Sequence, residues 1–286
     1  MSAGRRILVT GANGQLGQEL REVASAEWLF TDVEELDICS KAAVRDFIVA
    51  NNVGTIVNCA AYTNVDRAEE EPEVAKRVNG DAVAVLAELS KECGVRLTHI
   101  STDYLFGGEV FTAPIDEDTE PKPLGVYGRT KLMGERAIIE SGCSYVILRT
   151  AWLYSTYGTN FVKTIMRLSS EREELRVVND QIGTPTYARD LALVIRDICD
   201  SGVEVEGIYN YTNEGAISWY DFACAIVEIA GHNCRVVPCT TAEYGAKAAR
   251  PAYSVLDKTK IRGVIHRDIP AWRASLEECI KRMAQL

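Results

Sequence analysis

The chain has 286 residues, of which 47% are hydrophobic and 25% charged, and its formal net charge is −10. This length suffices for one large domain or two modest ones with a substantial core, and the composition is that of an ordinary globular protein. The acidic balance disfavours nucleic acid and anionic membrane surfaces as partners, although backbone amides and a few arginines can still bind a small anionic ligand.

The N-terminal segment, the cysteines and the histidines indicate the cellular compartment and whether a metal site is expected. The N-terminus lacks the long apolar run of a secretory signal, and no stretch approaches the roughly 18 apolar residues of a membrane span. The nine cysteines are odd in number, scattered and without a CxxC pair, which favours reduced thiols over a disulfide framework or a zinc site. We therefore expect a cytoplasmic protein with no membrane partner and no metal. His99 lies in an apolar run and is interpreted as a packing residue.

The first half of the chain alternates short apolar runs with segments of helical period. Helix 40–52 has Ser40 as its expected N-cap, and helix 71–94 ends at Gly94, a plausible C′ glycine. Such alternation predicts right-handed crossovers and a parallel sheet with helices on both faces. The predicted strands are 5–11, 28–32, 54–61, 95–102 and 144–150, and the predicted helices are 14–25, 40–52, 71–94 and 127–142.

After Thr150 this rhythm changes, with a helix, a short strand, a Gly/Pro loop and further helices, including one at 218–231. The pattern predicts an α/β fold of Rossmann type, a doubly wound parallel sheet with a smaller, discontinuous C-terminal substrate lobe. We divide the chain into a Rossmann domain, residues 1–150 plus about 186–207, and a substrate lobe, residues 151–185 and 208–286.

A glycine-rich turn, "VTGANGQLGQEL", places Gly11, Gly14 and Gly17 between the first strand and the first helix. One glycine permits the tight turn, one lets a diphosphate approach the backbone, and one lets helix and strand pack closely. The helix N-terminus then offers free N–H groups to phosphates. Asp32 ends the next strand, where a carboxylate accepts hydrogen bonds from ribose hydroxyls. The turn therefore predicts a dinucleotide site that accepts NADH.

Tyr127 and Lys131 stand four residues apart at the start of a predicted helix, so they share one face. The spacing is common by chance, and a solvated helix face is the simplest interpretation. However, Thr102 ends the strand before that helix, and ligands bind at the carboxyl ends of strands in doubly wound sheets. A tyrosine whose pKa is lowered by a nearby ammonium can act as a proton donor, while a threonine hydroxyl orients a carbonyl. The three residues therefore predict ketone reduction beside a nicotinamide.

The blocks "TGANGQLG", "NCAAYTNVD", "ISTDYLF", "YGRTKLMGE", "RTAWLY", "NFVKTIMRL", "VVNDQIGTPTYARDLA" and "ARPAYSVLD" occur in this order over nearly the whole chain. Together they resemble the extended short-chain dehydrogenase/reductases and, within them, the dTDP-4-dehydrorhamnose reductase family. This resemblance implies NADPH- or NADH-dependent reduction of the 4-keto group of dTDP-4-dehydro-β-L-rhamnose to dTDP-L-rhamnose. It also implies a homodimer.

The resemblance assigns roles to individual residues. Tyr127 is implied as the proton donor, Lys131 as its partner on the nicotinamide ribose, and Thr102 as a contact of the substrate oxygen. Implied cofactor contacts are Gly14, Gln15, Leu16, Asp32, Asp37, Ile38, Ala61, Tyr62, Thr63, Tyr127 and Lys131, beside Gly11 and Gly17 from the turn. Implied substrate contacts are Thr102, Asp103 and Trp152, with Asn160, Gln181 and Arg250 as further candidates. Trp152 fits plain core packing equally well.

One departure concerns a metal that the resemblance associates with glutamates at a dimer contact. Glu19 matches one such position, but Arg189 and Arg273 stand at the other two. Since two cations cannot be ligands, we expect no metal, and an ion pair between Glu19 and one of these arginines would replace it.

Several alternatives stay open at this stage. A dehydratase of the same superfamily would need a second carboxyl, whereas Thr102 and Asp103 are followed by Tyr104. An epimerase and a cofactor-binding regulatory subunit are the other rivals. The choice between NADH and NADPH, and between rhamnose and talose as the product sugar, also stays open.

Overall fold

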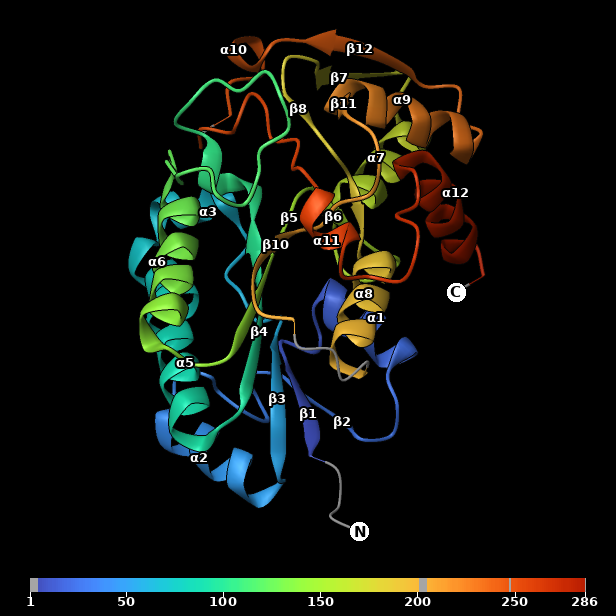
Figure 1. The fold of residues 1–286 in the computed structure, drawn as a ribbon. Coiled ribbons are helices and arrows are strands. Elements are labelled where there is room, and N and C mark those ends of the chain that lie inside the picture. The colour runs from blue at the N-terminus through green and yellow to red at the C-terminus, as the bar shows by residue number, and fades with distance from the viewer. Residues whose placement is uncertain (1–4, 201–204, 247, 286) are drawn as a thin grey trace.

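The computed structural model describes residues 5–200, 205–246 and 248–285 and is centred on one parallel sheet (Figure 1). The sheet has six strands in the order β10-β5-β4-β3-β1-β2. The chain reverses its direction of travel across the sheet between β1 and β3, which places the ligand crevice of such a fold at their carboxyl ends. The predicted Rossmann-type sheet is therefore confirmed. The strands are β1 (Arg6–Thr10), β2 (Trp28–Thr31), β3 (Val53–Asn58), β4 (Arg96–Thr102), β5 (Tyr145–Thr150) and β10 (Gly207–Asn210).

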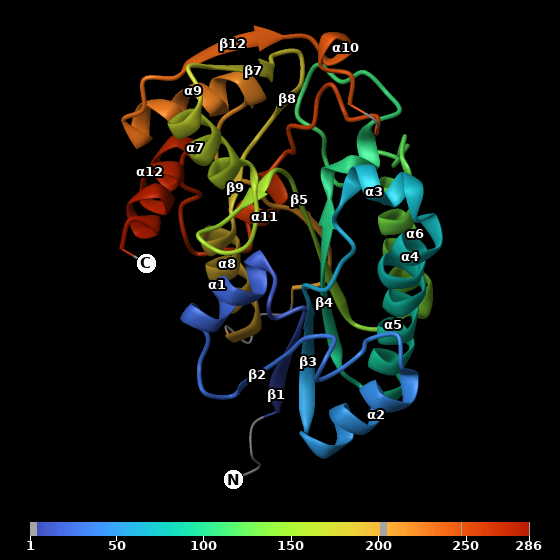
Figure 2. The ribbon, with the colours of Figure 1, turned by 180° about the vertical axis from the view of Figure 1, so that it is seen from behind.

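Both faces of this sheet are covered by helices (Figures 1 and 2). Helices α1 (Gln15–Val23) and α8 (Ala188–Asp200) pack together on one face, and α2 (Lys41–Ala50), α5 (Ala82–Cys93) and α6 (Val126–Ser141) cover the other. Side chains alternate between the faces along a strand. In β1, Ile7 and Val9 accordingly join the core under α1 and α8, whereas Leu8 joins the core under α2 and α5. The apolar runs of the strands are therefore buried on both sides.

The segment predicted as one helix over 71–94 is broken into three parts. It consists of α4 (Pro72–Lys76), a π-helical turn at Arg77–Asp81 and α5, and Gly94 ends it with φ +61 as expected. Within the π turn, Asn79 accepts a hydrogen bond from the backbone N–H of Tyr62 (2.8 Å) and donates one to its carbonyl (3.0 Å). The extra residue thus turns an amide toward the loop after β3, and π turns of this kind are frequent near functional sites. A further short helix, α3 (Val65–Glu70), was not predicted.

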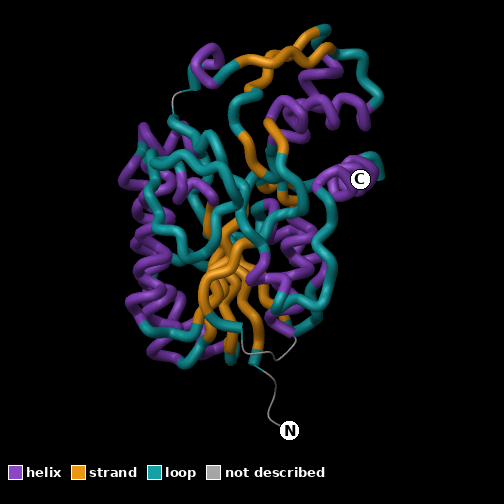
Figure 3. Tube along the Cα trace, turned by 45° about the horizontal axis from the view of Figure 1, so that its top comes forward, coloured by secondary structure: helices purple, strands orange, loops and turns teal. Residues whose placement is uncertain are grey.

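The second lobe stands above the carboxyl ends of the main sheet, and Figure 3 shows its strands apart from those of the sheet. Its core combines Tyr154, Val162, Phe222, Ile226 and Leu276 with neighbouring apolar groups.

The remaining elements of the described chain are β6 (Leu153–Tyr154), α7 (Phe161–Glu171), β7 (Glu174–Val178), β8 (Ile182–Gly183), β9 (Thr186–Tyr187), β11 (Ile217–Ser218), α9 (Trp219–Ala230), β12 (Arg235–Cys239), α10 (Thr241–Tyr244), α11 (Thr259–Arg262) and α12 (Trp272–Met283), and a 3-10 turn follows β4 at Asp103–Phe106.

The domain division stays a prediction. The main sheet continues past residue 207, because β10 pairs with β5 as far as Asn210. Residues 201–204 of the predicted segment lie outside the described part.

Among the helices of the described ranges, none is long and apolar enough to cross a membrane. All nine cysteines are unpaired thiols.

Candidate functional site

The glycine turn between β1 and α1 leaves its backbone open to the crevice. Gly11 has φ +68, and a Cβ on it would lie 2.5 Å from the nitrogen of Ala60, so only glycine fits. A Cβ on Gly17 would lie 2.5 Å from the Cα of Ala12. Because Gly17 has no side chain, α1 can lie close to the turn. Gly14 is the N-cap of α1 and supplies no side-chain cap. The first N–H groups of α1 are therefore free for an anionic ligand.

Next to this turn lies a hollow of about 290 Å³ at the ends of β2 and β3. Asp32 sits at its mouth, where one carboxylate oxygen accepts from the N–H of Asn13 (2.8 Å) and the other from that of Val33 (2.8 Å). The site residues predicted for the cofactor that line this hollow are Gly11, Gly14, Asp32, Asp37, Ile38 and Ala61. The hollow has the position and the carboxylate that the adenosine half of a dinucleotide requires.

A larger cavity of about 530 Å³ adjoins this hollow and shares Gly11, Gly14, Cys59 and Ala61 with it. It lies over the carboxyl ends of β4 and β5. The structure thus brings together residues predicted from distant parts of the chain. Those lining this cavity are Gly11, Gly14, Gln15, Leu16, Gly17, Ala61, Thr63, Thr102, Asp103, Tyr127, Lys131, Trp152 and Asn160.

Tyr127 stands in the first turn of α6, and Thr102 is the last residue of β4. The ring of Tyr127 meets that of Tyr104 edge-on, with centroids 5.3 Å apart. Burial raises the pKa of Tyr127 to about 12, against the hydrogen bond with Thr102, which lowers it. The expected lowering of this pKa by Lys131 is not found, because the amine of Lys131 lies against other groups.

Lys131 is only 2% exposed, and its Nζ donates to the carbonyl of Ile100 (2.6 Å). Nζ also lies 3.1 Å from Nε2 of His99, whose Nδ1 lies 3.0 Å from the amide nitrogen of Asn58. Burial lowers the pKa of Lys131 to about 8, opposed by Glu135 and Cys59. The interpretation of His99 as a packing residue was therefore incomplete: it is fully buried, but it contacts a predicted site residue.

Asp103 follows Thr102 and is nearly buried, with one carboxylate oxygen accepting from the Thr102 hydroxyl (3.2 Å). Burial raises the pKa of Asp103 to about 6, although hydrogen bonds from Ser254 and Thr102 oppose the rise. A carboxyl in this state changes charge near neutral pH at the wall of the cavity.

Trp152 both lines the cavity and packs against the second lobe. Its indole stacks on that of Trp219 with ring centroids 3.5 Å apart and planes inclined by 11°. Its φ of +48 is unusual for a residue with a bulky side chain. Gly183 leaves room for this placement, since a Cβ there would lie 2.5 Å from Cε2 of Trp152. Both interpretations of Trp152 from the sequence thus describe part of its surroundings.

Of the four other predicted contacts, one lines the cavity and three do not. Asn160 lines the cavity, caps α7 by accepting from the N–H of Lys163 (3.1 Å), and donates to Gln15 Oε1 (3.0 Å). In the described part of the chain the two hollows are not lined by Tyr62, Gln181 or Arg250. The Tyr62 hydroxyl donates to Glu71 (2.8 Å), Gln181 to Thr241 (2.9 Å), and Arg250 to Asp66 (2.9 Å).

Sequence reasoning missed several wall residues. Ser101, Tyr104 and Thr159 line the cavity, and His99 reaches Lys131 from the same strand as Ser101. Because alternate residues of a strand share a face, the run "HIST" carried a signal for His99. No such signal marked Asn58, whose contact with His99 spans 41 positions.

Glu19, the residue considered as a metal ligand, lies in a cluster of ion pairs. Glu19 is fully buried, and its carboxylate accepts from Ser155 (2.6 Å) and Arg282 (3.1 Å), with Arg189 at 3.7 Å. The hypothesis of a pair with Arg189 is confirmed, whereas Arg273 pairs with Glu228 and Glu277, and Arg282 was not foreseen. Within the described residues no group of three or more His, Cys, Asp or Glu could hold a metal.

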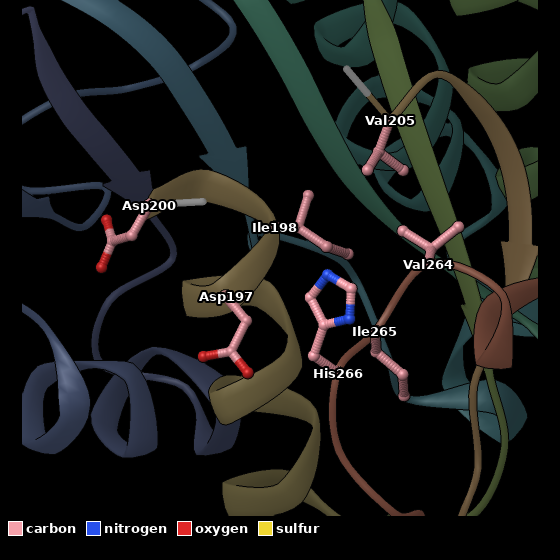
Figure 4. Close-up of a pocket in the computed structure, with 7 residues that line it drawn as sticks. All are labelled: Asp197, Ile198, Asp200, Val205, Val264, Ile265 and His266. Atoms are coloured by element: carbon pink, nitrogen blue, oxygen red, sulfur yellow. The ribbon is translucent and has the colours of Figure 1, made fainter. Parts of the chain in front are cut away.

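A separate hollow of about 280 Å³ lies between the end of α8 and residues 264–266 (Figure 4). It contains none of the predicted site residues. Its Asp197 forms an ion pair with Arg267 (2.6 Å). In the part of the chain that the structure describes, the predicted site residues that line a hollow therefore gather in the cleft formed by the two adjoining hollows.

Comparison with known proteins agrees with this geometry. The RmlD substrate binding domain profile matches residues 5–285. A dTDP-4-dehydrorhamnose reductase of Aggregatibacter actinomycetemcomitans is 41% identical, covering 95% of this chain and 97% of that protein. Crystal structures of dTDP-4-dehydrorhamnose reductases from Clostridium acetobutylicum (40% identity) and, in complex with NADP, from Bacillus anthracis (39%) each superpose with TM-score 0.93 over 98% of this chain and 100% of theirs.

Proposed function

Because the chain belongs to the RmlD substrate binding domain family, we propose that it reduces the 4-keto group of dTDP-4-dehydro-β-L-rhamnose to dTDP-L-rhamnose with NADPH or NADH. The observation that carries this function is the convergence of Thr102, Tyr127 and Lys131 on one cavity that continues into the glycine turn. A hydroxyl, a phenol and an amine placed together beside a dinucleotide site are the set that ketone reduction requires.

The residues of the glycine wall fit a dinucleotide. Gly11 and Gly14 give a diphosphate access to the backbone, and the free N–H groups of α1 face it. Asp32 would accept hydrogen bonds from the adenosine ribose, which makes NADH acceptable, and a relative of this family binds NADP. The remaining cofactor contacts we propose are Gln15, Leu16, Gly17, Asp37, Ile38, Ala61, Tyr62 and Thr63.

When bound, the reduced nicotinamide supplies the hydride for the carbonyl carbon. The protein supplies placement and the proton. Tyr127 donates its phenolic proton to the carbonyl oxygen, Thr102 orients that oxygen by a hydrogen bond, and Lys131, one helical turn after Tyr127, would bind the nicotinamide ribose. Each turnover therefore takes one proton from Tyr127, which must be replaced before the next.

For the sugar nucleotide we propose contacts on the second lobe and at the end of β4. Asp103, Trp152 and Asn160 line the cavity with Thr102. Gln181 and Arg250 stay predictions, because they do not line the cavity and their side chains bind Thr241 and Asp66.

Turnover of the purified chain with dTDP-4-dehydro-L-rhamnose and NADPH or NADH tests this function. We expect one reduced cofactor oxidised per ketosugar, and NMR of the product sugar distinguishes rhamnose from talose. Sugar conversion without net cofactor oxidation would instead identify an epimerase. Tight cofactor binding without any turnover, together with a co-purifying enzyme, would indicate a regulatory subunit.

We also propose the two-lobe division given above, a cytoplasmic location and a homodimer. Analytical ultracentrifugation of the full chain measures the last of these directly, since a single species at the mass of one chain would contradict it.

A further inference from the structure

Helix α6 begins without a side-chain cap of its own, because its N-cap is Gly125. The first N–H groups of a helix have no partner within the helix and must find an acceptor elsewhere. For Val126, the first residue of α6, that acceptor is Glu69 of α3, whose Oε1 accepts from its N–H at 2.7 Å. Helix α3 lies beside this end of α6 (Figures 1 and 2). The start of α6 is therefore tied to a helix that precedes it by 57 positions.

Gly125 leaves open the space that this carboxylate occupies. A Cβ on Gly125 would lie 2.7 Å from Oε1 of Glu69, and the only other atom within 4 Å is the carboxyl carbon of the same residue. The backbone of Gly125 (φ −105, ψ 173) is one that any residue adopts. The lack of a side chain at this position therefore suits the contact with Glu69 and is not required by the backbone.

The bond at Val126 lies directly before Tyr127. On the other side, Gly128 lies so close to Tyr104 that a Cβ there would be 2.5 Å from the carbonyl oxygen. The backbone of Tyr127 is thus held before and after, by the carboxylate of α3 and by the end of β4. The hydroxyl of Tyr127 forms a hydrogen bond with Thr102. Since the phenol ring is rigid, a shift of this helical turn would move the hydroxyl away from that bond.

Helix α3 provides a fixed point for the bond, because contacts outside α6 hold it. Ala68 is fully buried, and Asn64 caps the helix by accepting from the N–H of Arg67 (3.0 Å). Asp66 accepts from the guanidinium of Arg250 (2.9 Å). The carboxylate that reaches α6 therefore extends from a backbone whose place does not depend on α6.

We propose that Glu69 is a positioning residue, which fixes the first turn of α6 through Val126 and so keeps the hydroxyl of Tyr127 at Thr102. The proposal rests on the proposed function, in which Tyr127 is the proton donor. Within the described residues, the lining of the two hollows does not include Glu69. It therefore acts through Tyr127 and not by touching a ligand.

A carboxylate at the start of a helix also stabilises the helix itself, so a loss of stability does not distinguish the two roles. The chain contains a matched control. Asp257 accepts from the N–H of Thr259, the first residue of α11, at the same distance of 2.7 Å. Among the described residues that line the two hollows, Asp257 is not included.

Steady-state kinetics with dTDP-4-dehydro-L-rhamnose and NADPH give the first test. Glu69→Ala should lower kcat about tenfold with little change in the KM for NADPH, because the proton donor is misplaced while the cofactor wall remains. Glu69→Gln keeps an oxygen that can accept from Val126 and should retain most of the native kcat. Asp257→Ala should lower stability without lowering kcat. An unchanged kcat in Glu69→Ala, or an equal loss in Asp257→Ala, would overturn the proposal.

The double variant Glu69→Ala/Gly125→Ser separates positioning from capping. Serine is a favourable N-cap and satisfies the start of α6 from within the same segment, so the midpoint of denaturant unfolding should return toward the native value. The kcat should stay low, because a local cap does not tie α6 to α3. Recovery of kcat together with stability would show that Glu69 only caps the helix. If Glu69→Ala does not fold, Gly125→Ser alone displaces the carboxylate and is judged in the same way.

Crystal structures of the native chain and these variants give a readout that needs no turnover. We expect the hydroxyl of Tyr127 to lie beyond hydrogen-bonding distance of Thr102 in Glu69→Ala and in the double variant, and at its native place in Asp257→Ala. An unmoved hydroxyl in Glu69→Ala would overturn the proposal whatever reaction the protein performs. Failure of the proposed function and failure of this inference are therefore distinguishable.

Discussion

The two walls of the cleft are built by different means. The wall that we propose for the cofactor, called the cofactor wall below, consists of backbone: Gly11 and Gly17 let segments approach so closely that a single Cβ would collide with Ala60 or Ala12. The wall that we propose for the sugar, called the substrate wall below, consists of side chains held by other side chains, such as Trp152 on Trp219 and Asn160 on Gln15. A backbone wall fits a diphosphate common to many enzymes, and a side-chain wall can be changed to fit a particular sugar. Changes in each wall should therefore affect different binding steps.

The proposed reacting centre lies where the walls meet, and Tyr127→Phe should cause the largest loss of activity. Removing the proton donor should lower kcat by about 10² to 10⁴-fold, the usual contribution of general acid catalysis. Cofactor affinity, measured by fluorescence titration with NADPH, should be unchanged, since both walls remain. Tyr145→Phe is the control, because Tyr145 is the first residue of β5, at the end of the strand opposite the cleft, and lines neither hollow. Near-native kcat in Tyr127→Phe would reject the proton-donor role.

Gly11→Ala should break the cofactor wall. Strain at φ +68 and the contact with Ala60 together should lower the free energy of unfolding by about 4 kcal/mol and weaken NADPH binding. Gly94→Ala is matched in φ (+61) but meets nothing within 4 Å, so it should cost only about 1 to 2 kcal/mol and leave cofactor affinity intact. Denaturant unfolding and NADPH titration measure both effects. Equal losses in the two variants would mean that close backbone approach is unimportant.

Asp103→Asn tests the junction of the walls through pH. Burial raises the pKa of Asp103 to about 6. Above that pH the carboxyl of the native chain is charged, and keeping this charge buried lowers the free energy of unfolding. Below about pH 4 it is protonated both folded and unfolded, and the cost disappears. The variant should therefore gain stability over the native chain as pH rises, from nothing near pH 4 to at most about 3 kcal/mol near pH 7. Melting curves across this range, with the exposed Asp118→Asn as control, measure the gain, and a gain independent of pH would contradict the assignment.

Gly183→Ala should disturb the substrate wall alone. Its Cβ would displace the indole of Trp152, and we expect KM for the ketosugar to rise about tenfold with little change in NADPH affinity. Gly263→Ala is the control, since its nearest contact, 3.4 Å from the carbonyl of Lys260, is far less crowded. An equal loss of cofactor affinity in Gly183→Ala would show that the two walls are not independent.

Much of the cofactor wall could be predicted from short stretches of sequence. The glycine turn, Asp32 at the end of β2, and the Tyr127–Lys131 pair on α6 depend on a strand, a turn or one helical face. The parallel sheet could be predicted equally well, because strands that are buried on both faces appear in the sequence as continuous apolar runs. Less could be predicted of Gln181 and Arg250, whose partners Thr241 and Asp66 lie 60 and 184 positions away.

The sequence by itself determined most elements, the parallel sheet and the residues proposed for the reacting centre, because each rests on interactions between near neighbours. Only the tertiary structure decided which partners those residues have. It set Lys131 against His99, placed Trp152 at φ +48 over Gly183, and joined Glu19 to Arg282 across 263 positions. The physical reason is burial: once water is excluded, each polar group must use whatever donor or acceptor the fold brings beside it, and sequence spacing does not reveal that neighbour.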